Sequence, residues 1–282
     1  MIKILIIGAK GMLGQDLAMV FEKENPILFD REDIDIADRR QVFEKLMDIN
    51  PDIIINSAAY NAVDAAEEDF SIAQAVNVAG PANLAEAAQN LGAVFVHYGS
   101  DYVFDGQKKS GYREHDVPNP ISAYGMSKYL GEEQVKNKAA KFYIIRPSRL
   151  FGRPASSEGA KKSFVDVMLK LASEKDKLDV VDDERSNPTY SPDLAERTRF
   201  ILENKYPYGI YHAANGGACT WYEFANEIFK QSGVKIRLNP VPASKFPRPA
   251  ARPAYSSLKN TKLPAMRNWR EALDDYLSII SK

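Results

Sequence analysis

Five short apolar runs alternate with amphipathic stretches through the first half of this chain, and that alternation restricts its fold more than any other feature. The runs are Ile2–Ile7, Ile27–Asp30, Asp52–Asn56, Val94–Tyr98 and Phe142–Arg146. Nearly continuous apolar runs are typical of parallel strands that are buried on both faces. Helices are expected between them, over Leu13–Glu24, Arg39–Asn50, Phe70–Leu91 and Tyr124–Lys138. The sequence therefore predicts an α/β fold with a doubly wound parallel sheet and right-handed crossovers.

The second half of the chain is less regular and indicates a smaller, appended lobe. Ser191 and Pro192 predict a helix start, with the serine as its cap and the proline at the first helical position. A further strand is expected over Gly209–Ala213, and an amphipathic helix over Trp269–Ile280. We expect a dinucleotide-binding domain and a substrate-binding lobe. Their ranges are 1–148 (completed by about 174–212) for the domain, and 149–173 and 213–282 for the lobe.

Charge and cysteine content argue against several classes of function. The net charge of −1 over 282 residues gives no reason to expect a nucleic acid or a membrane surface as partner. The apolar run Ile4–Gly8 is far too short for a signal peptide or a membrane span. Cys219 is the single cysteine, so no internal disulfide can form, and no Cys/His cluster has the spacing of a metal site. We therefore expect a cytoplasmic protein without a bound metal.

Three glycines follow the first apolar run, at the point where a strand would turn into a helix. They form the pattern Gly8-Ala-Lys-Gly11-Met-Leu-Gly14. Gly8 would permit a sharp turn, Gly11 a close approach of the backbone to a pyrophosphate, and Gly14 a close helix–strand contact. The helix that begins here would offer free N–H groups and its positive dipole end to the phosphates. The pattern predicts a Rossmann-type dinucleotide site, although its spacing is GxxGxxG and not GxGxxG.

Asp30 and Arg31 follow the second run, where the adenosine of a bound dinucleotide would lie. A carboxylate at this position can bind the ribose hydroxyls of NADH, whereas an arginine can pair with the 2′-phosphate of NADPH. The two neighbours favour different coenzymes, so NADH and NADPH both stay open. Asp35 and Ile36 lie slightly further along and could flank the adenine.

Tyr124 and Lys128 are four residues apart on an expected helix, which places them on one face, one turn apart. The pKa of a phenol is about 10, and a nearby ammonium group would lower it toward neutral pH. Ser100 ends the fourth run, where its hydroxyl could donate to a substrate carbonyl. Together these groups could polarise a ketone and protonate it as a hydride arrives. Tyr255 and Lys259 repeat the spacing, but their proline-rich stretch has no such serine before it.

Further motifs are spread over nearly the whole chain. Those in the first half are Gly8-xx-Gly11-xx-Gly14, Asn56-Ser-Ala-Ala-Tyr60, Val63-Asp64 with Glu67, Asn77, Ser100-Asp-Tyr-Val-Phe104 and Tyr124-xxx-Lys128. Those in the second half are Asn187-Pro-Thr-Tyr190, Gly209-Ile-Tyr-His212, Trp221-Tyr-Glu-Phe224, Arg252-Pro-Ala-Tyr-Ser256 and Trp269-Arg-Glu-Ala-Leu273. Together they resemble the extended short-chain dehydrogenases, and more closely the dTDP-4-dehydrorhamnose reductase family.

The resemblance implies a role for individual residues. Those implied to bind the coenzyme are Gly8, Gly11, Met12, Leu13, Gly14, Asp30, Arg31, Asp35, Ile36, Ala58, Ala59, Tyr60, Tyr124 and Lys128. Those implied to meet the nucleotide sugar are Ser100, Asp101, Tyr124 and Arg149. Tyr124 would donate a proton, with Lys128 as its modulator. The implied reaction is reduction of the C4 keto group of dTDP-4-dehydrorhamnose by NADPH or NADH, which gives dTDP-L-rhamnose for cell-surface polysaccharide.

The departures from the family pattern lie on the substrate side. Ser100 stands where the family usually has threonine, and Asn61 stands where threonine is common. Arg149 replaces a tryptophan that packs near the sugar, so it puts a cation where the wall is usually apolar. This change could alter which sugar is accepted. Some members of the family bind magnesium at a dimer interface, but beyond Asp16 that set of acids is not matched, so a homodimer stays open.

Two other kinds of function stay open. A reductase or epimerase for another nucleotide sugar would use the same fold, although an epimerase usually needs an extra acid or base, and only Asp101 stands beside Ser100. A non-catalytic regulatory subunit, similar to the beta subunit of methionine adenosyltransferase, stays possible because of the change at Arg149. The intact Tyr124–Lys128 pair argues against it, because a pure binding module has no need of a tuned phenol.

Overall fold

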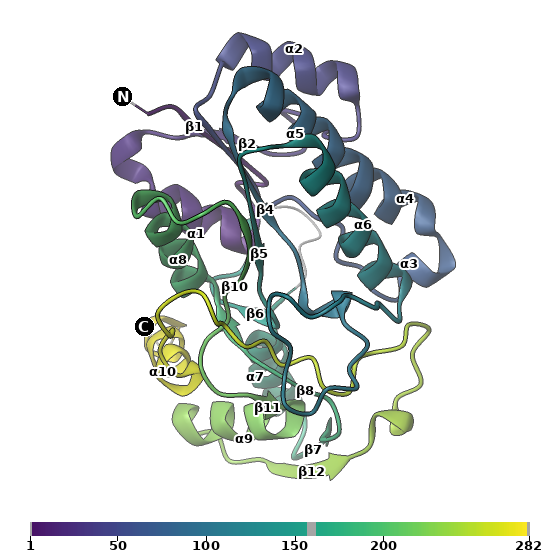
Figure 1. Ribbon diagram of the computed structural model, residues 1–282. Helices are drawn as coiled ribbons and strands as arrows, with labels where there is room; N and C mark the ends of the chain where they lie inside the picture. The colour runs from purple at the N-terminus through teal and green to yellow at the C-terminus, as the bar shows by residue number, and fades with distance from the viewer. Residues whose placement is uncertain (1, 157–161, 281–282) are drawn as a thin grey trace.

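The computed structural model describes residues 2–156 and 162–280, with a six-stranded parallel sheet at its centre (Figure 1). The strands lie in the order β10-β5-β4-β3-β1-β2. Their bounds are Ile4–Ile7 (β1), Ile27–Phe29 (β2), Ile53–Asn56 (β3), Val94–Tyr98 (β4), Phe142–Arg146 (β5) and Gly209–His212 (β10). Every one of these pairings is parallel, so the predicted α/β class with a doubly wound sheet is confirmed.

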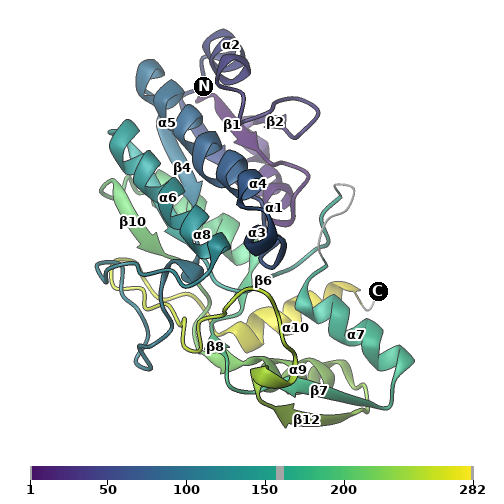
Figure 2. The same ribbon diagram turned by 90° about the vertical axis from the view of Figure 1, so that its right-hand side faces the viewer.

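Helices cover both faces of this sheet, with α2, α5 and α6 on one side and α1 and α8 on the other (Figures 1 and 2). Their bounds are Met12–Val20 (α1), Arg39–Ile49 (α2), Gly80–Leu91 (α5), Ala123–Lys138 (α6) and Ser191–Glu203 (α8). Leu46, Leu84 and Val135 are buried on the first face, and Leu17 and Leu194 on the second. The short helix α3, Ala65–Glu68, precedes α4, Phe70–Gln74, which continues through a π-helical stretch, Ala75–Ala79, into α5.

A smaller lobe packs beside the sheet, on the side where the strands end at their carboxyl ends (Figure 2). Its elements are Leu150–Phe151 (β6), Phe164–Glu174 (α7), Lys177–Val181 (β7), Arg185–Ser186 (β8), Thr189–Tyr190 (β9), Cys219–Thr220 (β11), Trp221–Ser232 (α9), Arg237–Val241 (β12) and Trp269–Ile280 (α10). Its core holds the buried side chains of Phe151, Phe224 and Trp269. β7 pairs with β12 within this lobe. Among the described residues, no helix is both long enough and apolar enough to cross a membrane.

The prediction that Ser191 caps helix α8 is wrong. Ser191 is the first residue of the helix, Tyr190 occupies the cap position, and no side chain caps the helix there. The reason is burial, because Ser191 is fully buried and a Cβ atom placed on Gly152 would come within 2.1 Å of its Oγ. The serine therefore packs against Gly152, where α8 meets the start of the lobe. The Tyr190 backbone is held instead by Asn215, whose Oδ1 accepts from its N–H at 2.8 Å.

A buried ion pair fixes the end of β5 against α6. The side chains of Arg146 and Glu132 are 2% and 1% exposed, and Arg146 Nη2 donates to Glu132 Oε2 at 2.5 Å. Arg146 Nε donates to both carboxylate oxygens, at 2.9 and 3.1 Å. Gly99 lies against this pair, because a Cβ atom there would come within 2.1 Å of Glu132 Oε1. The pair therefore sets the spacing of β4, β5 and α6 at the carboxyl end of β4, directly before Ser100.

We predict that Glu132→Gln lowers the free energy of unfolding by about 3 kcal/mol, because it leaves the Arg146 charge buried without a counter-charge. Urea unfolding followed by circular dichroism would measure this. Glu133→Gln is the matched control, since Glu133 is the next residue of α6 and its pair with Lys136 is partly exposed. The control should change stability by less than about 0.5 kcal/mol. Equal losses in the two variants would contradict the prediction.

Candidate active site

The glycine-rich turn joins β1 to α1 and lies against the end of β3. Gly8 has φ +80, and a Cβ atom on it would come within 2.7 Å of the Ala58 nitrogen. A Cβ atom on Gly14 would lie 2.0 Å from the Gly8 carbonyl oxygen. Helix α1 starts after Gly11 and no side chain caps it, so its first N–H groups are left for a ligand. The turn sits at the switch point between β1 and β3, where ligands of open α/β sheets bind.

The residues expected around the adenosine take different positions. The buried carboxylate of Asp30 accepts from the backbone N–H of Lys10 and of Arg31, each at 2.8 Å, whereas the Arg31 side chain is exposed. Asp35 is exposed, and its carboxylate accepts from Ala37 N at 2.9 Å. Ile36 is buried in the core, with its side chain against Gly80 at the start of α5. Asp30 thus braces the glycine-rich turn from the end of β2.

The segment after β3 lies against the glycine-rich turn. Ala58 and Ala59 are half-buried, and the Ala58 N–H donates to Asn56 Oδ1 at 3.1 Å. The buried side chain of Asn77 holds Tyr60 from both directions. Its Oδ1 accepts from the Tyr60 N–H at 2.9 Å, and its Nδ2 donates to the Tyr60 carbonyl oxygen at 3.0 Å. This arrangement places the start of the following loop beside α6.

Tyr124 and Lys128 lie on the first turns of α6, which starts after Ser122. The Ser122 hydroxyl caps the helix by accepting from the Gly125 N–H at 3.1 Å. The Tyr124 hydroxyl donates to Asn61 Oδ1 at 3.2 Å, and Lys128 Nζ donates to the Tyr98 carbonyl oxygen at 2.7 Å. Both side chains are more than nine-tenths buried.

Ser100 follows β4 and faces the same phenol. Its Oγ accepts from the Tyr102 N–H at 3.2 Å, and it lies near enough to Tyr124 for a hydrogen bond that lowers the phenol pKa. The structure therefore brings Ser100, Tyr124 and Lys128 together at the carboxyl ends of β4 and β5. By contrast, Tyr255 and Lys259 lie outside any helix, in an irregular segment of the lobe.

Burial governs the ionisation of these groups. It raises the pKa of Tyr124 above the ordinary phenol value, and the nearby Asp101 and Tyr102 add to the rise. It also lowers the pKa of Lys128 to about 8, although Glu132 opposes this. The expectation that Lys128 lowers the phenol pKa is therefore not met: burial is the main influence on that pKa, and the Lys128 ammonium donates to the Tyr98 carbonyl oxygen instead. A phenol with a raised pKa keeps its proton at neutral pH and can donate it.

Asp101 is a fully buried carboxyl group next to Ser100. It accepts from the hydroxyls of Ser148 at 2.8 Å and Ser256 at 2.6 Å. Burial raises its pKa, and the hydrogen bonds from Ser256 and Ser148 oppose the rise. Ser148 follows β5, whereas Ser256 belongs to an irregular segment of the lobe, residues 246–257, which we call the strap. Asp101 thus ties the strap to the ends of β4 and β5.

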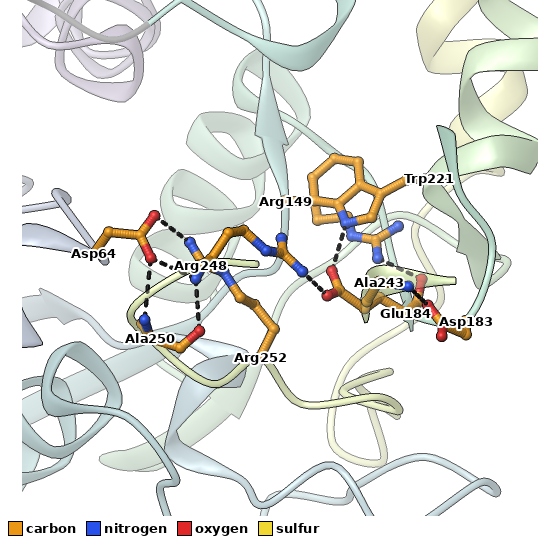
Figure 3. A network of polar contacts seen from close by, with 9 residues as sticks. All are labelled: Asp64, Arg149, Asp183, Glu184, Trp221, Ala243, Arg248, Ala250 and Arg252. Carbon is orange, nitrogen blue, oxygen red and sulfur yellow. Dashed lines mark hydrogen bonds and ion pairs between the residues drawn. The ribbon is translucent and has the colours of Figure 1, made fainter. Parts of the chain in front are cut away.

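A second contact ties the strap to the loop after β3, as Figure 3 shows. Arg252 donates to both carboxylate oxygens of Asp64 at 2.6 Å, and the Ala250 N–H donates to the same group at 3.2 Å. The hydrogen bond from Arg252 lowers the pKa of Asp64 to about 2. The strap therefore bridges the lobe and the main sheet directly beside the loop that carries Asn61.

Arg149 lies in a third polar cluster, also drawn in Figure 3. Its backbone has φ +38, and its guanidinium carbon lies 3.8 Å from the centre of the Trp221 ring. The guanidinium donates to the carbonyl oxygens of Cys219 at 3.0 Å and Glu184 at 2.8 Å. The Glu184 carboxylate in turn accepts from Trp221 Nε1 at 3.1 Å and from Arg248. The cation thus lies over the Trp221 ring and is hydrogen-bonded to two backbone carbonyl groups.

Several residues of this region carry no role in the sequence analysis. Asp64, Asn77, Arg252 and Ser256 stand inside the quoted motifs, and that is the signal that could have singled them out. Asn61 was noted only as a departure from a family pattern. Among residues 2–156 and 162–280, no group of three or more His, Cys, Asp or Glu side chains could hold a metal ion.

Comparison with known proteins agrees with this architecture. A family model described as the RmlD substrate-binding domain matches residues 2–281. The spore coat polysaccharide biosynthesis protein SpsK of Bacillus subtilis is 38% identical, over 98% of this chain and 97% of its own. The crystal structure of a dTDP-4-dehydrorhamnose reductase from Clostridium acetobutylicum is 38% identical, covers 100% of both chains and has a TM-score of 0.94. That of the Bacillus anthracis enzyme with NADP is 36% identical, covers 99% of both and has a TM-score of 0.93. The chain thus belongs to the RmlD substrate-binding domain family, the family of the dTDP-4-dehydrorhamnose reductases.

Proposed function

We propose that this protein reduces the C4 keto group of dTDP-4-dehydrorhamnose with a reduced nicotinamide coenzyme, giving dTDP-L-rhamnose for cell-surface polysaccharide. One observation carries the proposal: Ser100, Tyr124 and Lys128 meet at the carboxyl edge of the sheet, next to the uncapped start of α1. Relatives that cover the whole chain are named for this reaction, and SpsK is named for polysaccharide synthesis.

The chain has the features that a dinucleotide needs. The turn at Gly8 and the close contact at Gly14 leave the first N–H groups of α1 free to bind a pyrophosphate. When bound there, the coenzyme supplies a hydride to the ketone carbon. We assign Ala58, Ala59 and Tyr60 to the coenzyme side as well, because Ala58 lies against Gly8 of the turn. Lys128, close to Tyr124 on α6, is placed to hold the nicotinamide ribose.

Tyr124 supplies the proton that the ketone oxygen needs as the hydride arrives. Burial keeps the phenol protonated at neutral pH, which is the form that this direction of the reaction requires. Ser100 donates a hydrogen bond to the same oxygen and stabilises the negative charge that develops on it. Asp101 holds the surrounding segments in place through Ser148 and Ser256. The tyrosine side chain returns to its starting state by taking up a proton from water.

On the substrate side, the proposal also includes Asp101 and Arg149. The charge of Arg149 interacts with Asp101 and Tyr102, so the guanidinium stands close to the catalytic edge. Because it is stacked on Trp221, we propose that the two side chains form one flat wall for the sugar. We assign the coenzyme side to residues 1–148 and about 174–212, and the sugar side to 149–173 and 213–282.

We predict that Tyr124→Phe lowers kcat at least about 100-fold, because general acid catalysis contributes factors of that size. Affinity for the coenzyme should stay within a factor of about two. The measurement is the loss of reduced-nicotinamide absorbance with dTDP-4-dehydrorhamnose, with coenzyme binding followed by fluorescence. Tyr255→Phe is the matched control and should keep the parent rate. A Tyr124→Phe variant as fast as the parent would refute the assigned proton donor.

For the coenzyme we propose NADPH over NADH. The Asp30 carboxylate already accepts two backbone hydrogen bonds from the glycine-rich turn and its own neighbour, while the exposed Arg31 is placed to meet a 2′-phosphate. The related Bacillus anthracis structure contains NADP.

We predict that Arg31→Gln raises the KM for NADPH about tenfold and leaves the KM for NADH unchanged, because a charge-assisted contact to phosphate is lost. Steady-state rates with each coenzyme in turn would measure this. Arg40→Gln is a suitable control, since Arg40 is exposed on α2 and pairs with Glu44. If the KM values for both coenzymes rise together, Arg31 does not select the 2′-phosphate.

We also propose that the protein is cytoplasmic and forms a homodimer. Neither affects the chemistry above, because every side chain assigned to it comes from a single chain. The relevant partner in the reaction is the nucleotide sugar.

A further inference from the structure

The proton of the Tyr124 hydroxyl already has an acceptor within the protein. It is donated to Asn61 Oδ1 at 3.2 Å, on the loop after β3. Ser100, on the opposite segment after β4, lies beside the same phenol oxygen. In the proposed reaction both hydroxyls donate to one ketone oxygen. The Tyr124 proton must therefore leave Asn61 before it can be transferred.

Side chains pack around the Tyr124 ring on several sides. The ring lies edge-on to Tyr102 with 5.5 Å between centres, and it packs with the buried residues Ala66 and Ala73. These contacts fix the plane of the ring. The hydroxyl can still rotate about its C–O bond. Asn61 sets the direction of the hydroxyl proton, because it is the acceptor.

The loop that presents Asn61 is held at both ends. On one side Asn77 binds both the N–H and the carbonyl oxygen of Tyr60, and also donates to Ser127 of α6 at 3.0 Å. On the other side Asp64 is bound by Arg252 of the strap. The exposed Asn61 carboxamide thus has a defined place over the phenol.

From this geometry we propose that Asn61 is a positioning residue, which holds the Tyr124 proton until a substrate ketone replaces the carboxamide as its acceptor. The inference rests on the proposed function and deepens it. A neutral amide oxygen suits this task, since it accepts a hydrogen bond without the added strength of a charged acceptor. A ketone activated by Ser100 can then displace it.

The ionisable groups near the phenol come from several elements. Asp101 and Tyr102 follow β4 and raise the Tyr124 pKa, and Lys128 on the same helix donates to Tyr98. Glu67 of α3 accepts from the Ala123 N–H at 2.7 Å, at the start of α6. Asp64 is paired with Arg252. An acid introduced at position 61 would add a charged acceptor directly on the hydroxyl.

The test is Asn61→Asp, with Asn61→Thr and Asn61→Ala beside it. At about pH 8.5 the introduced carboxylate should hold the phenol proton and lower kcat at least about tenfold, with the KM for the sugar unchanged. As the pH falls to about 4, near the ordinary aspartate pKa, about half of that carboxylate takes up a proton, so kcat relative to the parent should rise at least about threefold. Asn61→Thr and Asn61→Ala introduce no carboxylate, so their kcat relative to the parent should show no such rise as the pH falls. Asn90→Asp, on the exposed end of α5, controls for the added charge.

A second measurement needs no substrate. In protein labelled with ¹³Cζ-tyrosine, the Tyr124 resonance is identified by its loss in Tyr124→Phe. In Asn61→Asp it should shift as the introduced carboxyl titrates, and in the parent and Asn90→Asp it should not. If the parent fails to reduce dTDP-4-dehydrorhamnose, the proposed function fails and this resonance still decides the role of Asn61. An unresponsive resonance, full activity of Asn61→Asp at high pH, or an equal loss in Asn61→Ala would each overturn the inference.

Discussion

The rest of the site depends on the hydrogen bonds that the buried carboxyl group of Asp101 accepts. It follows β4, and it accepts hydrogen bonds from Ser148 after β5 and from Ser256 in the strap. Burying a carboxylate costs free energy unless hydrogen-bond donors surround it, so Asp101 needs both of these hydroxyls close by. In meeting that requirement, the chain draws the lobe over the edge of the sheet where Ser100 and Tyr124 lie.

Burial that positions the catalytic groups also sets their chemistry. The Tyr124 pKa is raised and the Lys128 pKa is lowered to about 8, both chiefly by desolvation. These directions suit a phenol that must carry its proton to a ketone. The same burial makes Arg146 and Glu132 dependent on each other beneath Gly99. The exclusion of water from the ends of β4 and β5 therefore explains both the shifted pKa values of the catalytic groups and the mutual dependence of Arg146 and Glu132.

Much of the fold was predictable because its signals are local. The five apolar runs contain five of the six strands of the central sheet, and Trp269–Ile280 is a helix with the predicted bounds. The helix over Phe70–Leu91 was predicted in extent, but its π-helical middle was not, since periodicity does not reveal one extra residue in a turn. Ser191 looked like a cap because its sequence context fits one, yet its contact with Gly152 decides its place. Arg149 was expected to present a cation, but its position over the Trp221 ring could not be read from the sequence.

By itself the sequence determined the parallel sheet, the turn that needs Gly8 and Gly14, and the placing of Tyr124 and Lys128 on one helix face. Each follows from backbone sterics or from the repeat of a strand or helix, which act over a few residues. Only the tertiary structure decided that Asp64 meets Arg252, 188 residues away, and that Asp101 meets Ser256, 155 residues away. The acceptor of the Tyr124 proton, Asn61, was decided there too. Such contacts depend on how distant segments pack, and no local pattern encodes that packing.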